Sequence, residues 1–145
     1  SAFALETQLG SGASGTVWKC TKRTTGEVFA AKIIDLRPFK LRERFSMARV
    51  RREVEVMQCL RHPSIIALLD AFESEDQLIL VLEYAPGVEL FDAILAKNRY
   101  TEDEARPIFV QVTRALQYMH GLRIVHRDVK PENVMCMVRR KMPHG

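Results

Sequence analysis

The spacing of apolar residues changes along the chain, and this change constrains the fold of the 145-residue sequence more than any other feature. In the first third, apolar and polar residues alternate between turn signals, which is typical of strands. Helical spacing then appears from about Met47 to Leu60 and again after Thr101, where Thr101-x-x-Glu104 predicts a capping box. Strand-rich sequence thus precedes helix-rich sequence, with a break near residue 86, which predicts a two-lobed α+β fold.

Shorter patterns predict further elements. Residues 28–34 are expected to form a strand that returns from a turn at 24–27. Apolar runs at 65–69 and 78–82, separated by an acidic turn, predict another strand pair, and residues 90–96 predict a short helix.

Composition excludes several classes of protein. The net charge of +4 is small and dispersed, which argues against a nucleic-acid-binding protein. No apolar run approaches the roughly 18 residues of a membrane span, so no membrane partner is expected. Cys20, Cys59 and Cys136 lie far apart without metal or redox spacing, which favours a reduced protein and a cytoplasmic location.

The segment 10–17 has the pattern G-x-G-x-x-G-x-V, with Gly10, Gly12 and Gly15 as its glycines. Glycines let a backbone approach phosphates closely and direct amides toward them. A dinucleotide-binding loop would open into a helix, whereas this segment continues as a strand, and no Lys-Ser or Lys-Thr follows as in a P-loop. Two interpretations remain, a hairpin that covers a nucleotide and a plain glycine-rich hairpin.

Lys32 and Glu53 are candidate partners for a nucleotide and for each other. Lys32 is flanked by apolar residues on the predicted strand, so its ammonium is expected to seek a phosphate and a carboxylate. Glu53 shares a helix face with Val50 and Met57, which predicts that it points toward the apolar side, while Glu55 is turned away by roughly 200°. The alternatives are an edge lysine facing water and a surface glutamate.

The segment 126–133, His-Arg-Asp-Val-Lys-Pro-Glu-Asn, suggests phosphoryl transfer. Asp128 can accept the proton of an incoming hydroxyl, and Lys130 can neutralise the transferred phosphoryl group. Asn133 can offer an amide oxygen to Mg²⁺. Eight specified residues in order rarely arise by chance.

These motifs resemble the eukaryotic protein kinase family in identity and order, over residues 3 to about 136. The Lys-Pro-Glu sequence is similar to the Ser/Thr kinases, and the segment 87–92 is similar to the calcium/calmodulin-dependent group. The resemblance implies a partial kinase domain, with a complete β-rich small lobe and hinge at 1–85 and the start of the helical large lobe at 86–145.

The resemblance also implies roles for individual residues. Lys32 would bind the α- and β-phosphates of ATP and be held by Glu53. Glu89 would contact the ribose, and with Glu132 it would attract a basic residue upstream of the hydroxyl in a protein substrate. The remaining residues expected around ATP are Leu9, Gly10, Gly12, Gly15, Val17, Ala30, Leu82 as gatekeeper, Glu83 and Ala85 as hinge, and Met135.

The end of the sequence departs from the family pattern. Residues 134–145 contain no Asp or Glu, and 137–143 does not resemble the strands that lead to the metal-binding D-F-G motif. We therefore expect a kinase fragment with weak or no activity, in which calmodulin would act only through absent downstream segments. The alternative is a naturally short, kinase-like nucleotide-binding or regulatory protein, although such a protein needs no general base.

Overall fold

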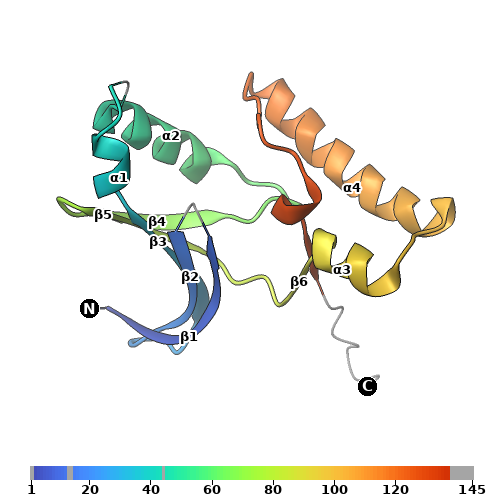
Figure 1. The fold of residues 1–145 in the computed structure, drawn as a ribbon, viewed down its shortest axis with the longest axis horizontal. Helices are drawn as coiled ribbons and strands as arrows, with labels where there is room; N and C mark the ends of the chain where they lie inside the picture. Colours follow the sequence, from blue (N-terminus) through green and yellow to red (C-terminus); the bar gives the residue numbers. More distant parts are fainter. Residues whose placement is uncertain (1, 13–14, 44, 138–145) are drawn as a thin grey trace. The chain divides into compact units, whose positions relative to one another are not determined.

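The computed structural model describes residues 2–12, 15–43 and 45–137. Contacts within the chain divide it into two compact units, Ser1–Tyr84 and Ala85–Gly145. Figure 1 shows a strand-rich first unit and a mainly helical second unit, as the change of apolar spacing predicted.

The first unit is built on an antiparallel five-stranded sheet of order β1-β2-β3-β5-β4. The strands are β1 (Phe3–Gly12), β2 (Gly15–Lys22), β3 (Val28–Asp35), β4 (Leu68–Glu73) and β5 (Gln77–Glu83). β1 and β2 form the glycine-rich hairpin, and β3 lies between β2 and β5. Residues of the hairpin and of the returning strand are therefore held in a fixed register.

One face of this sheet carries the main core and the helix α2 (Met47–Cys59), which follows the short helix α1 (Arg37–Lys40) (Figure 1). Leu36, Leu68, Leu78 and Leu80 form the buried cluster, and Met47, Val50 and Val54 of α2 pack against it. α2 itself has no buried residue. The helix is thus seated on the sheet through one partly buried apolar stripe.

The opposite face of the sheet carries an aromatic cluster. The ring centroids of Phe3 and Phe29 lie 5.8 Å apart, and those of Phe3 and Phe72 lie 6.4 Å apart, both in edge-on arrangements. Because successive strand residues alternate between faces, Phe29 and Ala31 point away from α2, while Ala30 and Lys32 share the α2 face.

The second unit contains β6 (Gly87–Glu89), α3 (Leu90–Lys97), α4 (Glu102–Gly121), the 3-10 turn η1 (Pro131–Asn133) and β7 (Met135–Met137). β6 and β7 pair antiparallel, with Val88 opposite Cys136. α4 buries Ala115 and Met119, and both hydrogen bonds of its predicted capping box are present. None of the described helices is long and apolar enough to cross a membrane.

Most elements lie where the sequence predicted them, with two differences. The strand predicted at 65–69 is displaced to β4 at Leu68–Glu73, and the short elements α1, β6 and β7 were not predicted. Pro107 lies inside α4, which continues on both sides of it. The sequence of residues 137–143 did not resemble the strands expected before the D-F-G motif, and residues 138–145 lie outside the described residues.

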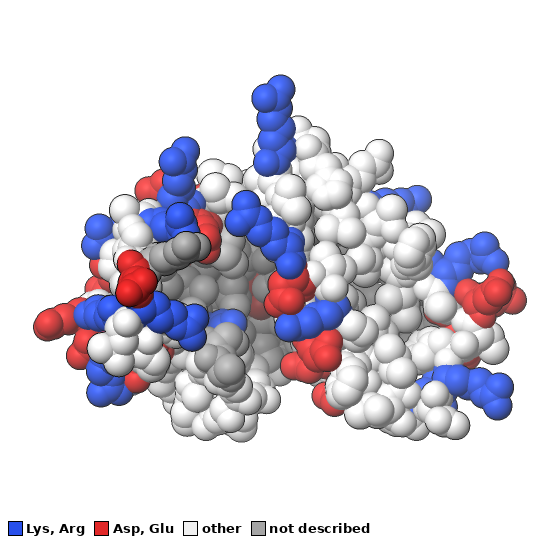
Figure 2. Space-filling model, turned by 45° about the horizontal axis from the view of Figure 1, so that its top comes forward, with Lys and Arg blue, Asp and Glu red and all other residues white. Residues whose placement is uncertain are grey.

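Charged side chains of both signs are interspersed over the described parts of the face in Figure 2. This agrees with the dispersed +4 charge of the sequence.

Candidate functional site

The three glycines of the hairpin differ in what surrounds them. Gly15 has a φ of +118°, and a Cβ built on it would lie 2.2 Å from the carbonyl oxygen of Ile33. Cβ atoms built on Gly10 and Gly12 would meet nothing within 4 Å. Gly15 is therefore required by the close approach of β2 to β3, whereas Gly10 and Gly12 leave open space beside the backbone. Residues 13 and 14 of this hairpin lie outside the described residues.

The sheet brings four predicted site residues onto one face. Val17 is the direct cross-strand partner of Lys32, and Ala30 is the partner of Leu82. Ala30 and Lys32 are two residues apart on β3, so all four lie on the face that carries α2. Lys32 is half-buried. Leu9 lies on β1 at an irregularity of the register and is 48% exposed.

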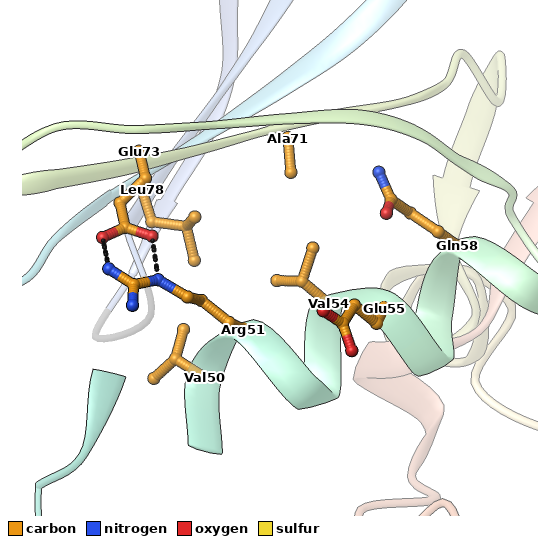
Figure 3. A pocket seen from close by; sticks show the side chains of 8 residues that line it. All are labelled: Val50, Arg51, Val54, Glu55, Gln58, Ala71, Glu73 and Leu78. Carbon is orange, nitrogen blue, oxygen red and sulfur yellow. Dashed lines mark hydrogen bonds and ion pairs between the residues drawn. The ribbon is translucent and has the colours of Figure 1, made fainter. Parts of the chain in front are cut away.

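Glu53 does not occupy the predicted position. It is exposed, and no ion pair joins it to Lys32 in the described parts of the chain, where pairs are defined by an N···O separation of at most 4.0 Å. The residues of α2 that reach the core are Met47, Val50 and Val54, so Glu53 flanks the apolar stripe. Glu55, which was expected to point away, lines a cavity beside α2 (Figure 3).

The predicted hinge residues lie at the junction of the two units. The backbone amide of Glu83 donates a 2.9 Å hydrogen bond to the carbonyl oxygen of Ala67. The backbone amide of Glu83 is therefore already used within the first unit. Glu83 belongs to the first unit and Ala85 begins the second, so the two predicted hinge residues lie in different units.

In the second unit, the segment from the end of α4 through η1 brings two predicted residues, Lys130 and Asn133, to the carboxylate of a third, Asp128. Lys130 Nζ lies 3.2 Å from Asp128 Oδ2. Asn133 Nδ2 donates to the same oxygen at 3.0 Å and to the Asp128 carbonyl oxygen at 2.8 Å. His126 Nδ1 accepts the backbone N–H of Asp128 at 3.2 Å. The contact of His126 was not predicted. The sequence pattern His-x-Asp could have indicated it, because a side chain can accept a hydrogen bond from the backbone N–H two residues later.

These contacts favour the ionised form of Asp128. The hydrogen bond from Lys130, and then that from Asn133, lower the pKa of Asp128 below its ordinary value. Lys130 and Asn133 both contact Oδ2, so neither of these two side chains uses Oδ1. Asp128 is thus a charged carboxylate that can accept a hydrogen bond and a proton.

Asn133 is suited to metal binding through a single atom. Because its Nδ2 is used by Asp128, its Oδ1 is the atom that can coordinate a hard cation. Among residues 2–12, 15–43 and 45–137 there is no group of three His, Cys, Asp or Glu side chains that could hold a metal ion. Mg²⁺ fits this donor only if phosphate and water oxygens complete its coordination.

The short sheet β6–β7 supports the end of this loop. The amide of Leu90 donates a 2.7 Å hydrogen bond to the carbonyl oxygen of Val134, and Glu89 lies opposite Met135. A Cβ built on Gly87 would lie 2.1 Å from the Cys136 carbonyl oxygen, so the strands approach too closely for a side chain there. Glu89 and Met135, two predicted ATP contacts, are thereby cross-strand neighbours.

Comparison with known proteins agrees with these motifs. The model of the protein kinase domain matches residues 3–143. A probable serine/threonine-protein kinase, fhkD of Dictyostelium discoideum, is 42% identical over 137 residues, which cover 92% of this chain and 18% of that protein. The carbon catabolite-derepressing protein kinase of Candida glabrata is 44% identical over 127 residues, covering 88% of this chain and 20% of that one. The chain spans about a fifth of the length of these relatives.

A solved structure shares the fold. The crystal structure of Rad53 1-466 in complex with AMP-PNP superimposes with a TM-score of 0.83 at 37% identity, covering 95% of this chain and 35% of that chain. The predicted kinase-like α+β fold is thereby confirmed. With the family model matched over nearly the whole chain, and with relatives named as serine/threonine kinases, the chain belongs to the protein kinase family.

Proposed function

We propose that this chain binds ATP and carries the catalytic loop for transfer of its γ-phosphoryl group to a serine or threonine hydroxyl of a protein. The observation that carries the proposal is the arrangement of Lys130 and Asn133 around the ionised carboxylate of Asp128. The complex of the related Rad53 structure with AMP-PNP supports ATP as the nucleotide.

In this proposal, residues of both units bind one ATP molecule. Val17, Ala30 and Leu82 supply apolar contacts to adenine from the first unit, with Leu9, and Met135 does so from the second. The open backbone at Gly10 and Gly12 leaves room for phosphates, which the Lys32 ammonium would neutralise.

The proposed reaction is an in-line displacement at the γ-phosphorus. The hydroxyl oxygen forms a bond to phosphorus as the bond to the β,γ-bridging oxygen breaks, and ADP leaves with that electron pair. Asp128 accepts the proton of the hydroxyl, and Lys130 stabilises the charge of the transferred group. Mg²⁺, bound in part by Asn133 Oδ1, would neutralise charge on the phosphates.

The proposal extends to the substrate preference, the kinase group and the location of the protein. Glu89 and Glu132 are both exposed in the second unit, which supports a preference for a basic residue upstream of the target hydroxyl. The similarity of residues 87–92 supports a place in the calcium/calmodulin-dependent group. The described cysteines are all free, in keeping with a cytoplasmic protein.

The proposal is tested by measuring MgATP affinity with isothermal titration calorimetry. Lys32→Ala should weaken binding at least tenfold, because the phosphates lose their proposed cation. Asp128→Asn should leave MgATP affinity within about threefold while removing any transfer of labelled phosphate to a serine peptide. Unchanged MgATP affinity in Lys32→Ala would contradict the assignment.

A further inference from the structure

We propose that the ion pair between Arg51 and Glu73 is a positioning contact that sets the rotation of α2 on the sheet and thereby keeps Glu53 on the side of Lys32. The inference rests on the proposed function, since it concerns how the Lys32–Glu53 pair is assembled for ATP. Neither Arg51 nor Glu73 belongs to the sequence motifs described above.

The contact is bidentate and well aligned. Arg51 Nη2 lies 2.6 Å from Glu73 Oε1, and Arg51 Nε lies 2.8 Å from Oε2 (Figure 3). The Glu73 side chain is 31% exposed, and the hydrogen bonds from Arg51 lower its pKa. A planar guanidinium held by both carboxylate oxygens fixes direction as well as distance.

The rest of α2 leaves its rotation weakly constrained. The helix has no buried residue, and its contact with the core rests on the partly buried Met47, Val50 and Val54. A pocket of about 220 Å³, open to solvent, lies beside this contact on the Arg51 side, lined by Val50, Arg51, Val54, Glu55, Gln58, Ala71, Glu73 and Leu78 (Figure 3). Because packing is incomplete there, the ion pair spans the gap that side chains do not fill.

Helix geometry relates this contact to Glu53. At about 100° per residue, Arg51 lies roughly 70° from the centre of the apolar stripe, and Glu53 lies roughly 90° from it on the other side. Glu73 is on β4, the edge strand, whereas Lys32 is on β3, on the far side of β5. Holding Arg51 at β4 therefore turns Glu53 toward the side of the sheet where Lys32 lies.

The register places the two contacts close together along the sheet. Glu73 is opposite Leu78, which is opposite Ile34, and Lys32 is only two residues from Ile34 on the same strand. All of these residues share the face that α2 covers. No Lys32–Glu53 ion pair is present among the described residues, so the proposal concerns the direction in which α2 presents Glu53 and not a pair already formed.

Charge reversal tests the inference, read out as the Kd of the full chain for MgATP. Arg51→Glu should raise this Kd about threefold or more, because two carboxylates would then face each other. Glu73→Arg should do the same, and the double variant Arg51→Glu/Glu73→Arg should return the Kd to within about twofold of the original. Thermal melting of each variant identifies any that fail to fold, and the double variant then decides.

Arg52→Glu is the matched control. Arg52 neighbours Arg51 on α2, is exposed, and makes no ion pair within the described ranges, so this charge reversal should leave the Kd unchanged. Arg51→Glu should also have no further effect in a Glu53→Gln background, because the contact acts through Glu53. A purely structural role of Arg51 would persist in that background.

The outcomes separate the two proposals. If Lys32→Ala and Glu53→Gln weaken MgATP binding but Arg51→Glu does not, the positioning role is wrong and the proposed function stands. An equal effect of Arg51→Glu and Arg52→Glu, or failure of the double variant to restore affinity, also overturns it. If Lys32→Ala leaves MgATP binding unchanged, the proposed function fails, and this inference fails with it.

Discussion

Replacement of Gly15 by alanine should destabilise the protein strongly, although the added group is one methyl. The backbone at Gly15 has a φ of +118°, which side chains rarely adopt, and such strain costs about 1–3 kcal/mol. The new Cβ would also lie 2.2 Å from the carbonyl oxygen of Ile33, so β2 or β3 must shift. Together these effects predict a loss of about 2–4 kcal/mol.

The expected loss converts to a fall in melting temperature. Unfolding entropy of about 2.1 cal/mol/K per residue gives roughly 0.3 kcal/mol/K if all 145 residues melt together, so Gly15→Ala should melt roughly 7–13 °C lower. Circular dichroism at a fixed heating rate measures the shift. Gly12→Ala is the matched control, because a Cβ at Gly12 meets nothing within 4 Å.

The same pair of variants separates structure from binding. Gly12→Ala should melt within about 2 °C of the original protein, since its change in stability stays within about 0.5 kcal/mol. It should nevertheless weaken MgATP binding, because the methyl group enters the space assigned to the phosphates. A Gly15→Ala protein that melts within 2 °C of the original, or a Gly12→Ala protein that falls equally far, would refute this reasoning.

Three further predictions concern the N-terminal cap of α4 and the carboxylates of Glu104 and Asp128. Thr101→Ala should lower the free energy of unfolding by about 1 kcal/mol in urea titrations, because it removes the capping box of α4. The hydrogen bond from Lys97, and then that from the Thr101 backbone, lower the pKa of Glu104 from 4.5 to about 2. The stability that ionised Glu104 contributes should therefore be complete above pH 4.5 and be lost as the pH falls toward 2. A urea midpoint that does not change between pH 4.5 and pH 2 would count against this prediction. Asn133→Ala should raise the pKa of Asp128, because the ionised carboxylate loses one hydrogen bond. Carboxyl NMR measures this pKa, and an unchanged value would show that Asn133 does not stabilise the carboxylate.

Local motifs identified loop residues that the structure brings together. The spacing of Asp128, Lys130 and Asn133 suggested a shared role, and their side chains meet within 3.2 Å because the 3-10 turn folds the segment back on itself. Alternation along β3 likewise predicted a lysine among apolar residues, and the strand register extends that face to Val17 and Leu82.

Contacts between distant segments were harder to predict. The apolar spacing of α2 predicted Met57 among its core-facing residues, and this placed Glu53 on the apolar side of the helix. Met57 is 40% exposed in the structure, so the predicted core-facing side was centred too near Glu53. The true rotation depends on Arg51 meeting Glu73, 22 residues away. The β6–β7 pair joins segments almost 50 residues apart with three residues each, too short for a periodic signal.

The most direct test of the central claim asks whether Lys32 and Asp128 belong to one nucleotide site. In amide NMR spectra of the isotopically labelled chain, Mn²⁺ replaces Mg²⁺ in the complex with ATP, and its unpaired electrons broaden nearby signals. The account predicts that Mn²⁺–ATP broadens signals around both residues at the same concentration, and that excess MgATP restores both. Broadening around only one of the two, or around neither, would contradict it.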